Sequence, residues 1–172
     1  EHTVTEEVTG IDLVRTQLQI AGGATLADLG LQAQADITAP RGYAVQLRIN
    51  MEVVQPDGSA KPTGGTLRAF EPPSGPGIRV DTFGYAGYTT VPNFDSLLAK
   101  LVVHVRSPRY QDVAQKAYRA LSEFRIDGVA TNIPFLQTLL QRPEFAANDF
   151  TTRFVELHAA EAGENLPQRS RR

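Results

Sequence analysis

Two hydrophobic repeats follow each other along the chain, and together they predict a protein of mixed strands and helices. Over residues 42–51, apolar and polar side chains alternate, which is the pattern of a half-buried strand. Over residues 110–124, apolar side chains recur at intervals of three and four, which is the pattern of an amphipathic helix. Residues 9–21 show the same helical spacing and place three apolar residues on one face, Ile11, Val14 and Leu18.

Weaker patterns predict the other elements. Short strands are expected at 66–70 and 77–82, turns at 56–58 and 64–65, helices at 131–140 and 150–162, and a short helix with a loop within 24–40. Residues 96–105 are ambiguous between a strand and a helix, and a helix-like start that passes into a strand at 101–105 fits the pattern. Because strands come first and helices mostly later, we expect the α+β class, with an antiparallel sheet flanked by helices. One domain is predicted over 1–162, followed by a disordered tail or linker over 163–172.

Composition restricts the kinds of partner. The chain has 172 residues, 41% of them hydrophobic and 21% charged, which suits one soluble globular domain. The net charge of −2 does not favour a nucleic acid, and the basic cluster at 169–172 offers few phosphate contacts. No apolar run reaches the roughly 20 residues that cross a bilayer. We therefore expect a cytoplasmic protein that contacts neither nucleic acid nor membrane.

Several chemical motifs are absent from the sequence. There is no cysteine, which excludes disulfides and thiolate metal sites, and there is no P-loop and no Gly-x-Gly-x-x-Gly turn. The glycine-rich run at 74–77 contains a proline that removes an amide donor, so we interpret it as a turn. The histidines are widely separated, at His2, His104 and His158, and no metal site is predicted.

Arg48 is the residue that most invites a functional interpretation. In the alternating strand it shares a face with Gln46 and Asn50. That face is either a solvated surface, or a rigid support from which a guanidinium binds an oxyanion. The early acids also have two interpretations, as general bases or as surface charges: Glu1, Glu6 and Glu7. The loop that contains Tyr85, Tyr88, Phe94 and Asp95 either lines a ligand site or packs its aromatic side chains on the core.

Four motifs follow one another along the chain. They are Glu1-His2-Thr3-Val4-Thr5-Glu6 with Thr9-Gly10-Ile11-Asp12-Leu13, then Gly42-Tyr43-Ala44-Val45-Gln46-Leu47-Arg48-Ile49-Asn50, then Tyr85-Ala86-Gly87-Tyr88 leading to Phe94-Asp95-Ser96-Leu97-Leu98-Ala99-Lys100-Leu101, and Phe124-Arg125-Ile126-Asp127-Gly128-Val129-Ala130-Thr131-Asn132. In this order they resemble the carboxyl-terminal region of the biotin carboxylase family, over about residues 1–158.

The resemblance implies part of an ATP-grasp ligase that uses ATP and bicarbonate to carboxylate biotin on a carrier protein. In the family, carboxyphosphate forms first and breaks down to CO₂, which the ureido nitrogen of biotin captures. Glu1 matches the catalytic glutamate that deprotonates bicarbonate, although Thr3 stands where the family has proline. Arg48 matches the arginine of the family's Arg-Ile-Asn strand. Its implied role is to hold the bicarbonate or phosphate oxyanion and to stabilise the biotin enolate.

The same resemblance implies further site residues and partners. Asp95 is expected near Arg48, Tyr85 and Tyr88 are expected beside the biotin pocket, and Arg79 matches a position of the family's dimer interface. The implied partners are a biotin carboxyl carrier domain, a carboxyltransferase domain and a second copy of the full enzyme.

Two departures from the family's pattern favour a divergent branch. The stretch 50–58 differs from the family's Asn-Ala-Glu-Asp-Pro, and the loop between Gly22 and Gly42 is longer than usual. We favour an acyl-CoA carboxylase of fatty acid metabolism, with its domains fused in one chain, over pyruvate carboxylase.

The chain is expected to be a segment of a longer enzyme, because it begins without methionine and without the family's lid, ATP-binding lysines and Mg²⁺ ligands. Biotin, ATP and Mg²⁺ are the cofactors expected of the full enzyme. The segment alone is expected to be inactive and to bind none of them.

Two other interpretations stay open. One is another ATP-grasp ligase, such as a carbamoyl-phosphate synthase, and the loop over 85–96 argues against it because that loop belongs to the family's biotin-handling side. The other is a non-catalytic domain for dimerisation or carrier docking. Glu1 together with Arg48 argues against the second, because an interaction domain does not need both.

Overall fold

The computed structural model describes residues 2–91 and 95–164, and only the backbone from residue 160 onward. Its helices are α1 (Thr3–Thr9), α2 (Leu13–Ala21), the 3₁₀ turn η1 (Gln34–Asp36), α3 (Tyr110–Glu123), α4 (Ile133–Leu140), α5 (Pro143–Ala146) and α6 (Phe154–Glu164). Its strands are β1 (Tyr43–Asn50), β2 (Glu52–Val54), β3 (Ala60–Pro62), β4 (Ala69–Glu71), β5 (Ile78–Thr82), β6 (Leu97–Val105) and β7 (Arg125–Asp127). Of the predicted tail, residues 165–172 lie outside the described residues.

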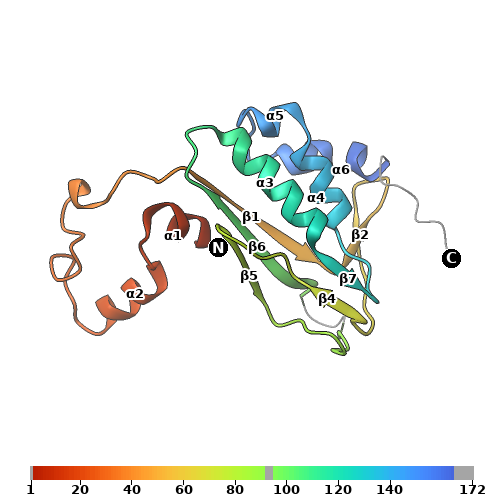
Figure 1. Ribbon diagram of the computed structural model, residues 1–172, viewed down its shortest axis with the longest axis horizontal. Helices are drawn as coiled ribbons and strands as arrows, with labels where there is room; N and C mark the ends of the chain where they lie inside the picture. Colours follow the sequence, from red (N-terminus) through yellow and green to blue (C-terminus); the bar gives the residue numbers. More distant parts are fainter. Residues whose placement is uncertain (1, 92–94, 165–172) are drawn as a thin grey trace.

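The main sheet has three strands in the order β1-β6-β5, and all its neighbours are antiparallel. Two smaller antiparallel pairs, β2 with β3 and β4 with β7, adjoin it. Figure 1 shows helices α3 to α6 gathered on one side of the sheet. Helix α1 lies against the end of the sheet, in contact with β1 and β6, and leads to α2, which projects away from it; we call α1 and α2 the arm. The expected α+β class, with an antiparallel sheet flanked by helices, is confirmed.

The core lies between the main sheet and α3. Alternate residues of β1 and β6 point into it, and α3 contributes the apolar face that its spacing predicted. The buried members include Leu47, Ile49, Leu101, Val103, Val113, Ala117 and Leu121. The intervening residues of β1 therefore face the opposite side of the sheet, which we call the open face.

The ambiguous segment 96–105 is a strand from Leu97 to Val105, without a helical start. Both faces of this central strand are covered over much of its length: Leu101 and Val103 lie in the core, and Leu98 and Val102 on the other face are also buried. A strand buried on both sides has no alternation of apolar and polar residues, which explains the ambiguity.

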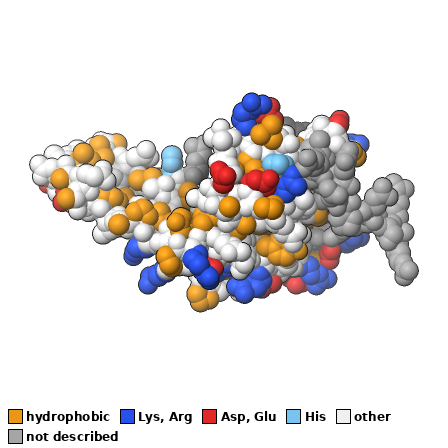
Figure 2. Space-filling view, turned by 90° about the horizontal axis from the view of Figure 1, so that it is seen from above, with side chains coloured by type: hydrophobic (Ala, Val, Ile, Leu, Met, Phe, Trp, Pro, Cys, Tyr) orange, Lys and Arg blue, Asp and Glu red, His pale blue; other side chains and the backbone are white. Residues whose placement is uncertain are grey.

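Of the helix predicted over 9–21, Leu13–Ala21 is present as α2, and it is preceded by a separate helix, α1, that was not predicted. Gly10, in the left-handed conformation at φ 77°, ends α1, and the Asp12 side chain caps α2 by accepting from the Arg15 amide at 2.9 Å. The predicted apolar face of α2 is not buried, because Val14 is 62% and Leu18 69% exposed. Figure 2 shows apolar side chains exposed along this arm.

Candidate anion site on the open face of the sheet

The open face of the sheet carries two rows of side chains that run across three strands. Residues directly opposite in an antiparallel pair point to the same side. One row consists of Arg48 on β1, Lys100 on β6 and Asp81 on β5. The next row consists of Gln46, Val102 and Arg79.

Arg48 has its guanidinium at the surface, and among the described residues it pairs with the acidic side chain of Asp95. Its Nη2 donates to Asp95 Oδ2 at 3.4 Å, and the side chains are 48% and 66% exposed. The other oxygen of Asp95 accepts from the Leu97 amide at 3.0 Å, which holds the carboxylate at the start of β6. The structure therefore brings these two predicted site residues together and leaves the arginine accessible to a ligand.

Lys100 was not predicted as a site residue, and it lies directly opposite Arg48. It is half-buried on the central strand, with Asp81 on its other side. The Asp81 carboxylate, however, accepts two hydrogen bonds from Arg79, at 2.9 and 3.1 Å. Like charges placed opposite each other on neighbouring strands are unfavourable. The Arg48–Lys100 pair therefore makes this part of the face suited to a small anion.

Arg79 links α1 to the edge strand β5. Its Nη1 lies 3.3 Å from Glu6 Oε2 and 3.7 Å from Glu7 Oε1, in addition to the bonds with Asp81. Hydrogen bonds to Asp81, and then to Glu6, raise the pKa of Arg79 above its usual value. This arginine, expected at a dimer interface, thus connects parts of one chain in the structure.

The amino end of α1 reaches the same face. Thr3 is buried, and its hydroxyl donates to the side-chain oxygen of Gln46. Gln46 precedes Arg48 by two residues on one side of β1, so the start of α1 adjoins the Arg48 row. Glu1 itself lies outside the described residues.

The two predicted biotin-pocket tyrosines lie in the loop between β5 and β6. Tyr88 packs on a buried cluster formed by Met51, Leu67 and Leu98, and its ring is 5.4 Å from that of Tyr85. Tyr85 is 61% exposed. Within residues 2–91 and 95–164, no hydrogen bond or ring contact joins either tyrosine to Arg48 or Asp95.

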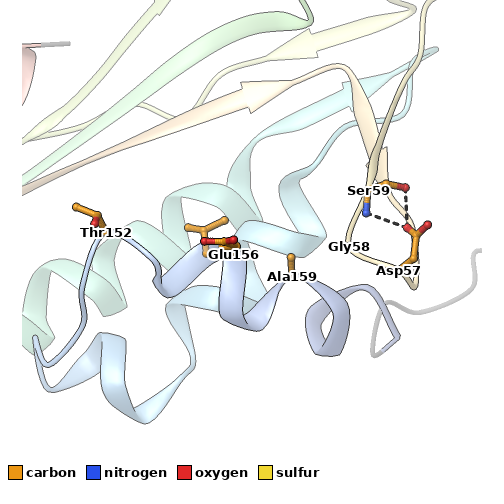
Figure 3. A pocket seen from close by; sticks show the side chains of 7 residues that line it. Asp57, Gly58, Ser59, Thr152, Glu156 and Ala159 are labelled. Carbon is orange, nitrogen blue, oxygen red and sulfur yellow. Dashed lines mark hydrogen bonds between the residues drawn. The ribbon is translucent and has the colours of Figure 1, made fainter.

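A hollow lies away from this site, between α6 and the turn that joins β2 to β3. Figure 3 shows its lining, in which Asp57 turns back to accept hydrogen bonds from the amide and hydroxyl of Ser59. None of the predicted site residues lines it.

Within the part of the chain that the structure describes, no cluster of three or more His, Cys, Asp or Glu side chains could hold a metal ion. The described helices are also too short or too polar to span a membrane.

Comparison with known families identifies the fold. The family model for the biotin carboxylase C-terminal domain matches residues 46–157. This chain belongs to the biotin carboxylase family. The model for the ATP-binding domain of the carbamoyl-phosphate synthase L chain matches residues 1–29, which hold α1 and α2.

Individual relatives are similar over nearly the whole chain. Pyruvate carboxylase of Aspergillus terreus is 42% identical over 98% of this chain and 14% of its own length. A single-chain long-chain acyl-CoA carboxylase has a solved structure with 46% identity and a TM-score of 0.89, covering all of this chain and 19% of that one. The biotin carboxylase domain of a thermophilic 2-oxoglutarate carboxylase, solved with bicarbonate bound, has 38% identity and a TM-score of 0.79, over 92% of this chain and 34% of that one.

The chain therefore spans about one seventh of the length of the curated relatives that it matches. What the relatives share over these residues is the biotin carboxylase C-terminal region. They differ in the acceptor named for them, which is pyruvate, a long-chain acyl-CoA or 2-oxoglutarate.

Proposed function

We propose that this chain acts as the C-terminal part of a biotin carboxylase, in which Arg48 and Lys100 hold a small oxyanion close to biotin. The supporting observation is the pair itself: two cations directly opposite each other on rigid strands, with the arginine oriented by Asp95 and exposed to a ligand. An interaction surface alone gives no reason to place two like charges in this arrangement.

The residue types fit the chemistry of bicarbonate. A guanidinium offers parallel N–H donors that match a carboxylate-like anion, and an ammonium group adds a compact positive charge. Because strand pairing holds the backbones of both residues before the ligand arrives, their side chains would stabilise negative charge that develops during the reaction with little rearrangement. Bound ATP would supply the activation of bicarbonate, and Glu1 the base, as its motif implies.

ATP and Mg²⁺ are proposed to be held by residues outside this segment. The open face offers cations, which suit an anion, whereas the described residues contain no acidic cluster of the kind that holds a metal ion. The match of α1 and α2 to an ATP-binding domain model supports an arm that belongs to the nucleotide-binding half. The segment alone is therefore expected to be inactive.

The acceptor of the carboxyl group is a separate question. Acyl-CoA is our proposal from the sequence, and the similarity to a long-chain acyl-CoA carboxylase supports it. Pyruvate is the competing acceptor, because the similar curated relatives include pyruvate carboxylases. The anion site would serve either enzyme, since carboxylation of biotin precedes the transfer. A carrier domain, a carboxyltransferase domain and a second copy of the enzyme, with Arg79 near the contact, are proposed as partners.

A non-catalytic role in dimerisation or carrier docking is the alternative. The deciding experiment uses a full-length biotin carboxylase in which these 172 residues form the C-terminal segment, and measures ADP formation with Mg-ATP and free biotin. Our proposal predicts that ADP formation depends on bicarbonate and is accompanied by carboxylation of biotin. An enzyme that folds and binds ATP but never carboxylates biotin would contradict it.

A further inference from the structure

Asn132 lies at the start of α4, but its side chain bonds to β1. It is 7% exposed; its Nδ2 donates to the Arg48 carbonyl at 3.0 Å, and its Oδ1 accepts from the Asn50 amide at 2.9 Å. An asparagine at a helix start usually accepts from an amide of the first turn. Asn132 makes no such capping bond. Its amide is instead used to fix the backbone on both sides of Ile49.

Glu52 holds the neighbouring part of the site. Its Oε1 accepts from Asn50 Nδ2 and its Oε2 from the Ser96 hydroxyl, both at 3.0 Å. Ser96 adjoins Asp95, and its carbonyl accepts from the Met51 amide at 2.7 Å. Glu52 thereby joins the end of β1 to the segment that carries the acidic partner of Arg48.

These bonds close a ring around Arg48. The ring leads from the guanidinium to Asp95, along the chain to Ser96, across Glu52 to Asn50, and through Asn132 back to the Arg48 carbonyl. It lies where the sheet itself is irregular, because the pairing of β1 with β6 shifts register between Ile49 and Asn50. The strand ladder alone therefore does not fix this end of β1.

We propose that Glu52 and Asn132 are positioning residues for biotin carboxylation, which act through Arg48 and do not touch the substrate. A long, exposed arginine has many rotamers, and holding both its backbone and its acidic partner limits the directions in which the guanidinium points. This inference rests on the proposed function.

The test uses the full-length biotin carboxylase with Glu52→Ala, because this change removes both accepting oxygens and with them the bonds to Asn50 and Ser96. Since small displacements of a positioned group can lower rates about a hundredfold, we expect kcat for carboxylation to fall at least about tenfold, with the KM for ATP unchanged. Glu71→Ala is the matched control, since Glu71 is exposed and pairs with Arg125 on the β4–β7 pair. It should keep full activity.

A second variant separates positioning from folding. Asn132→Ser supplies a hydroxyl that can cap α4 but is too short to reach both groups on β1. It should keep the helix and lose kcat to a similar degree. Both substitutions are then repeated in an Arg48→Lys background. A residue that acts through Arg48 should lose most of its effect there, whereas a merely structural residue lowers activity by the same factor in both backgrounds.

The outcomes are distinct. If the wild type carboxylates biotin and the variants keep full kcat, or lose it equally in both backgrounds, the positioning role is overturned and the proposed function stands. If the wild type binds ATP but does not carboxylate biotin, the proposed function fails, and this inference fails with it.

Discussion

Arg48 and Lys100 lie opposite each other on adjacent strands, and the repulsion between their positive charges is a local electrostatic penalty to the stability of the fold. Asp95 offsets part of it through an exposed contact at 3.4 Å, and exposed pairs contribute little to stability, about 0–1 kcal/mol. An anion between the two cations would remove the penalty. Removing one of these charges should therefore weaken anion binding without lowering the free energy of unfolding.

Lys100→Met tests this expectation, since it removes the charge and keeps most of the length of the side chain. In the full-length enzyme, the KM for bicarbonate should rise about tenfold or more, because a hydrogen bond to a charged group contributes about 1.5–3 kcal/mol. The free energy of unfolding should stay the same or increase slightly. Lys61→Met, at an exposed position of β3, is the control. An unchanged KM for bicarbonate would remove Lys100 from the site.

Of the residues around the anion site, the sequence could indicate Arg48 but not its surroundings. Arg48 was recognisable because apolar and polar residues alternate along β1, and the resemblance to the family placed Asp95 near it. Lys100 could not be recognised, because β6 is covered on both faces and strand register is not visible in a sequence. Asn132 was not singled out as a site residue, and only the tertiary structure shows its amide bonded to β1.

Among the elements, the connection from β7 to α4 places Asn132. Gly128 lies in this connection with φ 102°, a left-handed value that favours glycine. A Cβ at this position would lie 1.9 Å from the Thr66 carbonyl oxygen. The close approach of the two backbones therefore requires a residue without a side chain.

Gly128→Ala should lower the free energy of unfolding of the chain by at least about 1–3 kcal/mol, because it combines backbone strain with a steric clash. Gly75→Ala is the matched control: it has a positive φ of 130°, but open space around its missing Cβ. Denaturant unfolding should show a much larger loss for Gly128→Ala. Equal losses in both variants would mean that the backbone conformation alone, and not the close approach to Thr66, accounts for the effect.

The long elements and the short strand expected at 77–82, present as β5, were predictable, whereas several of the shortest strands were not. The strand at 42–51 and the helix at 110–124 have enough residues to show a clear period, and both are present as β1 and α3. β2, β3 and β7 have three residues each, which is too few for a period to be recognised. α5 was not predicted; it begins at Pro143, shortly after the helix expected over 131–140, because proline is tolerated in a first helical turn.

At the scale of the whole molecule, the arm exposes large apolar side chains on α2. α2 has no buried residue, and Val14 and Leu18 are its most exposed large apolar side chains. The segment between α2 and β1, residues 22–42, is mostly exposed. At its end, the Arg41 amide donates to the Val8 carbonyl at 2.9 Å, which ties the segment to α1. An apolar helix face of this kind promotes association.

The double substitution Val14→Lys with Leu18→Lys should reduce self-association of the 172-residue chain, as measured by sedimentation velocity at increasing concentration. In the full-length enzyme the same change should lower the thermal midpoint, because we propose that the ATP-binding half covers this face. Gln17→Lys with Gln19→Lys adds the same charge at polar positions of α2 and serves as the control. If the two double variants behave alike, charge alone explains the effect and the apolar face is not an interface.

The most direct test of the account is Arg48→Ala in the full-length biotin carboxylase, assayed by transfer of labelled bicarbonate to free biotin, with the dissociation constant for Mg-ATP measured in parallel. Arg153→Ala, which removes an exposed arginine of comparable size next to α6, is the control. We predict that carboxylation falls about a hundredfold or more, as it does when a preorganised charge-stabilising donor is removed, while ATP affinity is nearly unchanged. Full carboxylation by Arg48→Ala would contradict the assignment of the open face as the anion site.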